Sequence, residues 1–76
     1  MKLIDFKNIG NYNFILIFEN AESKEVNLKK LISNKVNIKE LNSARIDKDW
    51  GYLEFKDGIV DIEAKTLYKF CFGSVI

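Results

Sequence analysis

A chain of 76 residues has room for one domain, residues 1–76, with a thin hydrophobic core, because a chain of this size buries only about 60% of its unfolded surface. Its 47% apolar and 30% charged residues exclude intrinsic disorder, and its net charge of +1 excludes a broad electrostatic footprint for nucleic acid or an acidic membrane. Cys71 is the single cysteine and histidine is absent, so we expect no internal disulfide, no metal site and no cofactor.

The amino-terminal segment does not predict export or membrane insertion. Asp5 interrupts it before the apolar stretch of a signal peptide could form, and the later apolar runs are short and broken by charge. We therefore expect a cytoplasmic protein in a reduced compartment, with no membrane partner.

The first half of the sequence predicts a three-stranded meander followed by a short helix. The expected strands and turns are residues 3–6, 14–18 and 23–27, with turns at 8–11 and 19–22. The strand at 14–18 is apolar at every position, so we expect it to be central or covered on both faces. Its burial, by the fold or by a partner, is expected to be close to obligatory. Leu28, Leu31 and Ile32 then follow helical spacing, with Asn27 as the expected N-cap.

The second half predicts further strands and a final helix. The expected strands are residues 44–46, 52–55 and 59–62, with Asp57-Gly58 as a hairpin turn. From Glu63 onward the sequence is helical, and one face carries Ala64, Leu67, Tyr68 and Cys71. We therefore predict an α+β fold: a small antiparallel sheet of five to six strands with two short helices, in the order β-β-β-α-β-β-α.

The residues offer no set of groups for ordinary enzyme chemistry, so we expect a protein that is not an enzyme. The hydroxyl side chains have no histidine to act as their base, and Cys71 is expected to be an inert core residue on the apolar helix face. Residues 47–51 resemble the start of a calcium loop, but Tyr52 stands where that loop needs glycine and Gly58 where it needs glutamate. Solvated turn residues are the favoured interpretation of the acidic cluster that follows position 46.

Two groups of residues are candidates for contact with a partner. The middle third is basic, and a solvated helix face is its favoured interpretation over a nucleic-acid surface. The candidate basic patch comprises Lys24, Lys29, Lys30, Lys35, Lys39 and Arg45.

Toward the end of the chain, Phe70, Phe72, Val75 and Ile76 extend apolar character beyond the stripe that the last helix needs, so this tail either folds back onto the sheet or docks on another chain. The candidate partner contacts are Trp50, Tyr52, Asp61, Tyr68, Phe70 and Phe72.

Residues 53–68 carry a motif that resembles the signature of a bacterial family, domain of unknown function 2442. Members of that family typically end in Leu-x-Trp-x-x-Gly-x-Asp-Ile-x-Pro-x-x-Leu-Tyr, and Asp61, Leu67 and Tyr68 match this pattern. The strand that ends at Phe18, followed by a turn and Val26-Asn27-Leu28, is similar to the family's strand–turn–Val-Asp-Leu segment. The sequence departs from the pattern at Phe55, which stands for Trp, at Asn27, which stands for Asp, and at Ala64 and Lys56, which stand for Pro.

The resemblance implies a small α+β domain with no established activity. It also implies a gene beside that of another small family, in an arrangement similar to toxin–antitoxin cassettes. For the matching residues, we expect Asp61 to satisfy backbone donors near the start of the last helix, and Leu67 and Tyr68 to pack. The missing proline at Ala64 is expected to weaken that helix start a little.

These observations favour a non-catalytic protein-interaction module, the antitoxin-like or partner subunit of a bacterial two-gene cassette. Its expected partner is another protein or a second copy of the chain. The alternative is a small nucleic-acid-binding regulator that uses the basic segment 24–45.

Overall fold

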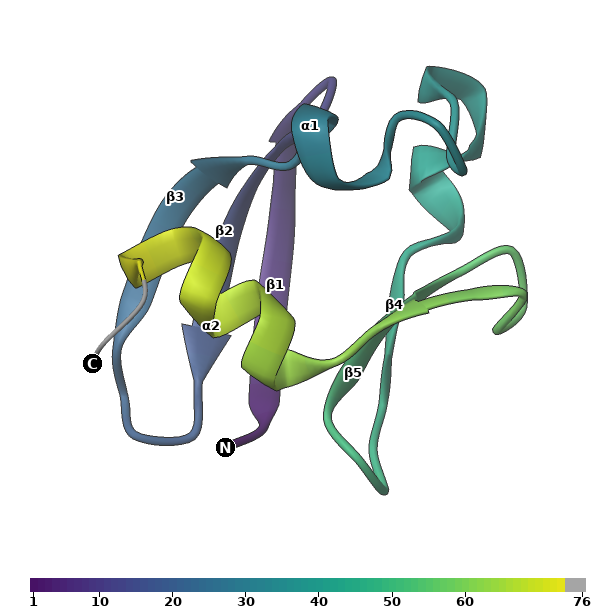
Figure 1. The fold of residues 1–76 in the computed structure, drawn as a ribbon. Coiled ribbons are helices and arrows are strands. Elements are labelled where there is room, and N and C mark those ends of the chain that lie inside the picture. Colours follow the sequence, from purple (N-terminus) through teal and green to yellow (C-terminus); the bar gives the residue numbers. More distant parts are fainter. Residues whose placement is uncertain (74–76) are drawn as a thin grey trace.

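The chain folds into two three-stranded antiparallel sheets and a few short helices in the computed structural model, which describes residues 1–73 (Figure 1). The first sheet contains β1 (Leu3–Gly10), β2 (Asn13–Phe18) and β3 (Ser23–Asn27). The second contains β4 (Arg45–Asp47), β5 (Tyr52–Phe55) and β6 (Val60–Ile62). The helices are α1 (Lys29–Ile32), the 3-10 helix η1 (Ile38–Ser43) and α2 (Ala64–Phe72).

The α+β class is confirmed, but the prediction of a single sheet with five to six strands is wrong. Between β3 and β4 the chain passes through α1 and η1, so β4 starts a new sheet instead of extending the first (Figure 1). The two sheets approach each other where the backbone N–H of Leu3 donates to the carbonyl oxygen of Gly51 at 3.2 Å. This hydrogen bond involves the turn between β4 and β5 and does not pair two strands, so the sheets remain separate.

Strand β2 is central in the first sheet, as its apolar sequence predicts. Phe14, Leu16 and Phe18 alternate onto one face and are fully buried there. Ile15 and Ile17 point to the opposite face, are half-buried, and lie outside the hydrophobic core formed by the described residues. The strand is therefore central but covered by the fold on one face.

The hydrophobic core joins both sheets to α2, which lies across one face of the first sheet (Figure 1). Phe14 of β2 and Phe55 of β5 meet edge to face, with ring centroids 6.2 Å apart, and this contact connects the two sheets. From α2, Ala64, Leu67 and Cys71 are buried, as the helical spacing predicts. Burial of a side chain such as Leu67 contributes about 1.5–3 kcal/mol, so packing holds this helix in place.

Both helix starts differ in detail from the predicted caps. Leu28 occupies the N-cap position of α1. Asn27, one residue earlier, makes the capping contact, because its side-chain oxygen accepts a hydrogen bond from the backbone N–H of Lys29 at 2.9 Å. At α2 the N-cap is Glu63, whose side chain makes no capping hydrogen bond. Within residues 1–73 Asp61 accepts no hydrogen bond at this helix start either, so its expected capping role is not observed. Val75 and Ile76 lie outside the described residues.

Helix η1 is tied to the second sheet through the carboxylate of Glu40. This carboxylate accepts a hydrogen bond from the backbone N–H of Asn37 at 3.0 Å and lies 3.3 Å from the ammonium of Lys56. The backbone hydrogen bond from Asn37 is the main cause that lowers the pKa of Glu40 below its ordinary value of 4.5. Desolvation opposes this effect, and the ammonium of Lys56 lowers the pKa further.

Because the folded pKa of Glu40 is lowered, its ionised form stabilises the fold above the unfolded value, and this stabilisation is lost as the pH falls through the folded pKa. We expect Glu40→Gln to lower the thermal midpoint at pH 7, and the difference from the unmodified chain to vanish at acid pH. Thermal melts followed by circular dichroism across this range measure it. Asp49→Asn, at an exposed turn carboxylate, is the control, and an equally pH-dependent loss in both variants would contradict the assignment to Glu40.

Candidate docking surface

The second sheet presents a polar face on the side opposite to the core. Arg45 pairs with Glu54, which pairs with Asp61, so these three side chains form one row across the sheet. Asp47 pairs with Tyr52 in the next row of the same face. Together with Trp50 on the turn between β4 and β5, these residues form what we call the docking face: Arg45, Asp47, Trp50, Tyr52, Glu54 and Asp61.

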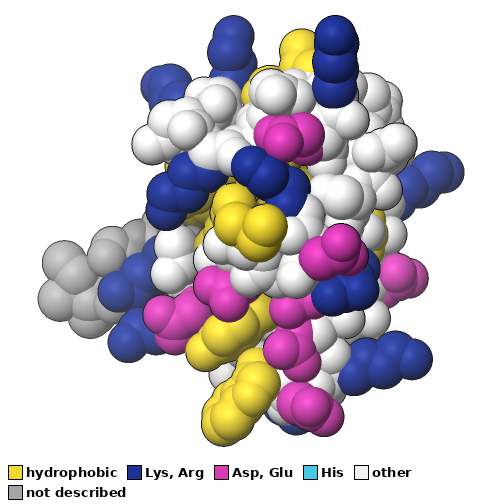
Figure 2. Space-filling view, turned by 90° about the vertical axis from the view of Figure 1, so that its right-hand side faces the viewer, with side chains coloured by type: hydrophobic (Ala, Val, Ile, Leu, Met, Phe, Trp, Pro, Cys, Tyr) yellow, Lys and Arg dark blue, Asp and Glu magenta, His cyan; other side chains and the backbone are white. Residues whose placement is uncertain are grey.

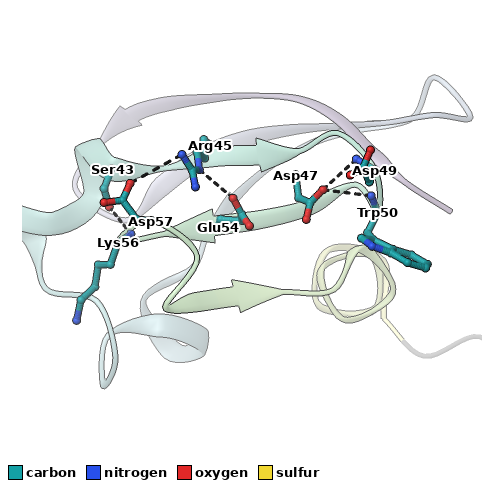
Figure 3. Close-up of polar contacts among 8 residues, drawn as sticks. All are labelled: Ser43, Arg45, Asp47, Asp49, Trp50, Glu54, Lys56 and Asp57. Atoms are coloured by element: carbon teal, nitrogen blue, oxygen red, sulfur yellow. Dashed lines mark hydrogen bonds and ion pairs between the residues drawn. The ribbon is translucent and has the colours of Figure 1, made fainter.

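Trp50 is displayed on a turn that is held by hydrogen bonds (Figure 3). The side-chain oxygen of Asp47 accepts from the backbone N–H of Asp49 at 2.9 Å and from that of Trp50 at 3.4 Å. The backbone N–H of Gly51 donates to the carbonyl oxygen of Asp47 at 2.6 Å. The indole is nevertheless 66% exposed, so the fold fixes the backbone under Trp50 while leaving its ring to solvent.

Gly51 fastens the same turn to the start of β1. Its φ of +72° is in the left-handed region that favours glycine, and its carbonyl oxygen accepts the hydrogen bond from Leu3. A Cβ atom at this position would lie 2.5 Å from the Cβ and 2.9 Å from the Cα of Lys2. Glycine is therefore required both by the backbone conformation and by the close approach of β1.

The docking face is acidic. The guanidinium of Arg45 already forms ion pairs, because its Nε lies 2.9 Å from Glu54 Oε1 and its Nη1 lies 3.8 Å from Asp57 Oδ1 (Figure 3). Residues 44–63 contain six acidic side chains against three basic ones. Figure 2 shows acidic side chains gathered around exposed hydrophobic ones on the side of the molecule where the second sheet lies. Asp61 also borders a groove of about 220 Å³ between α1 and the start of α2.

The other three predicted partner contacts lie on α2 and differ in role. Phe18 meets Tyr68 and Phe72 edge to face, at centroid distances of 5.2 and 6.2 Å, and Tyr68 and Phe72 are 4.7 Å apart. The Tyr68 hydroxyl donates to the carboxylate of Glu22, and this hydrogen bond is the main cause that raises the pKa of Tyr68. Tyr68 and Phe72 thus fasten α2 to the first sheet, whereas Phe70 is 37% exposed.

The six residues of the candidate basic patch do not share one element. They are distributed over β3, α1, the segment after it, η1 and β4. Arg45 is paired with acids, and the Lys24 ammonium lies 5.9 Å from the centre of the Phe72 ring. This placement adds no support to the alternative of a nucleic-acid-binding regulator.

Two further predictions concern chemistry within the described chain. Cys71 is buried on the core face of α2, and burial raises the pKa of its thiol, which is the opposite of what a reactive cysteine needs. Among residues 1–73 no group of three or more candidate metal ligands lies together. In the same range, no helix is long and apolar enough to cross a membrane.

The fold and the docking face define a small α+β domain that displays an aromatic side chain on an acidic sheet. A family model described as protein of unknown function (DUF2442) matches residues 3–73. The chain therefore belongs to this family, as the motif at residues 53–68 predicts. Searches of curated proteins and of solved structures found no match.

Proposed function

We propose that this chain is a non-catalytic protein-interaction module whose docking face binds a partner protein. The observation that carries the proposal is the exposed indole of Trp50 on a turn that is held on both sides by hydrogen bonds. Tryptophan is among the residues that most often dominate binding energy at interfaces. Because the turn is already ordered, little conformational entropy would be lost there on binding.

The charges around Trp50 support a partner of a definite kind. Asp47, Asp49 and Asp61 are not compensated by Arg45, which is held by Glu54 and Asp57. An acidic surface of this kind favours a partner with a basic patch, and such complementarity accelerates association more than it raises affinity. We propose that this partner is the second protein of a bacterial two-gene cassette, the setting that the family resemblance implies, with this chain as its antitoxin-like subunit.

The proposal predicts that Trp50→Ala strongly reduces capture of the partner. Loss of a central aromatic anchor costs at least about 2 kcal/mol of binding, which is roughly a thirtyfold weaker complex. The tagged chain is purified from nuclease-treated lysate of its host, and the co-purified proteins are weighed by mass spectrometry. The free energy of unfolding of the variant should change by no more than about 0.5 kcal/mol, because the indole is a surface group.

Lys48→Ala is the matched control, since it removes an exposed side chain from the same turn and should leave the partner in the eluate. A stoichiometric partner that is retained in equal amount by Trp50→Ala would refute the role of the docking face. A chain that elutes alone in every case would leave the interaction proposal unsupported.

A further inference from the structure

Among residues 1–73, no element covers the outer face of the first sheet, and this face is separate from the docking face. It carries Asp5, Ile17 and Ser23 in one row across β1, β2 and β3, and Lys7, Ile15 and Glu25 in the next. We call these six residues the open face. Helix α2 covers the other side of this sheet (Figure 1), and within residues 1–73 Ile15 and Ile17 are not part of the core.

An open face of this kind is costly for a central strand. Ile15 and Ile17 are only half-buried, and Ile4 and Ile9 of the same sheet are 55% and 41% exposed. Apolar side chains on a pleated surface are buried efficiently when a second sheet stacks on them, about 10 Å away.

The charges on the open face are complementary to those on the open face of a second copy that is turned to face it. Lys7 and Glu25 flank Ile15 on opposite sides, about 10 Å apart across β2. Neither side chain forms an ion pair among the described residues. A twofold axis parallel to β2 places the β1 edge of one copy over the β3 edge of the other at the same level. Lys7 of each copy then faces Glu25 of the other, and the isoleucines meet in the centre.

We propose that two copies of this chain associate face to face through the open face, with Lys7–Glu25 pairs on both sides of an isoleucine centre. A twofold axis across the strands would instead place Lys7 over Asp5 of the second copy. The Asp5 carboxylate, however, already accepts the backbone N–H of Phe6 at 2.8 Å, whereas Glu25 is free within residues 1–73. The axis parallel to the strands therefore uses the charges that lack a partner.

The size of the open face sets the strength of the dimer. Three strands that lie about 4.8 Å apart, each five residues long with a rise of about 3.4 Å per residue, give a face of roughly 15 by 17 Å. This is small against the roughly 800 Å² that each partner buries in a standard interface. The dimer is therefore expected to be weak and its population to rise steeply with protein concentration.

Charge reversal tests the dimer, with sedimentation equilibrium over a concentration series as the measurement. Lys7→Glu and Glu25→Lys should each be monomeric where the unmodified chain is dimeric, because each brings like charges together. The double variant should recover the dimer. An equal mixture of the two single variants should form a heterodimer, because each reversed charge then meets its opposite on the other copy. Circular dichroism verifies that every variant is folded.

Lys48→Glu and Asp49→Lys make the same charge changes on the turn beside Trp50 and should leave the dimer intact, as should Trp50→Ala. An unmodified chain that stays monomeric at every concentration would overturn the proposal, as would a dimer that both single reversals leave unchanged. Recovery by Lys7→Glu with Asp5→Lys, and not with Glu25→Lys, would overturn the proposed axis. None of these outcomes bears on the capture of a different protein through Trp50, so the two proposals fail separately.

Discussion

Replacing Phe18 with alanine is expected to lower the free energy of unfolding by about 3–5 kcal/mol. Phe18 is fully buried, and its ring contacts both Tyr68 and Phe72, so it is a central contact between the first sheet and α2. A domain of this length has roughly 4–11 kcal/mol in total, so the variant should lose a large share of its stability. Urea titration followed by far-ultraviolet circular dichroism measures the change.

Phe70→Ala is the control for this experiment, because it removes the same type of ring from α2, where Phe70 is 37% exposed. It should change the free energy of unfolding by about 0.5 kcal/mol. Equal losses in the two variants would mean that Phe70 belongs to the core. The same comparison shows why Phe72 is a poor site for testing partner contacts: its removal would disturb the Phe18 cluster and the fold with it.

Gly51→Ala is expected to have the second largest effect, a loss of about 2–4 kcal/mol in the free energy of unfolding. Alanine must adopt a φ near +72°, and its Cβ would lie 2.5 Å from the Cβ of Lys2 and 2.9 Å from the Lys2 backbone. The start of β1 must then move away, which breaks the hydrogen bond from Leu3 to Gly51. The same urea titration measures this loss.

Gly58→Ala provides a matched control, since Gly58 also has a positive φ, of +86°, but its added Cβ would make an ordinary 3.4 Å contact with Glu54. It should show the conformational cost alone, about 1 kcal/mol. If the two alanine variants are equally stable, the close approach of β1 to the Trp50 turn does not constrain the fold.

The strands were the most predictable part of the molecule. Residues 23–27 and 52–55 coincide with β3 and β5, because turn residues mark where these strands begin or end. Strand β1 continues past Phe6 to Gly10 through Lys7 and Asn8, since pairing with β2 through the backbone needs no apolar side chain at these positions. The separation into two sheets was not predictable, because it depends on the path of α1 and η1 and on no single residue.

The candidate contacts were predictable as residues and not as a surface. The helical spacing predicts that Tyr68 packs, and Phe72 lies four residues further on the same side of the helix, so the same signal could have placed Phe72 against the core. Tyr52 and Asp61 come onto one face only through the register of β4, β5 and β6, and Trp50 adjoins them on the turn between β4 and β5. The rigidity of the Trp50 turn depends on Asp47, whose sequence position suggests no more than a solvated turn.

The claim that Trp50 is the anchor of a docking face can be tested most directly by ¹⁹F NMR spectroscopy. Trp50 is the only tryptophan of the chain, so a 5-fluorotryptophan-labelled protein gives one ¹⁹F resonance, to which an unlabelled partner adds nothing. In the free protein this resonance should show the solvent-isotope shift of an exposed ring, because the indole is 66% exposed. We predict that the co-purified partner moves the resonance and removes the solvent-isotope shift. A partner that binds the chain and leaves both unchanged would contradict the account.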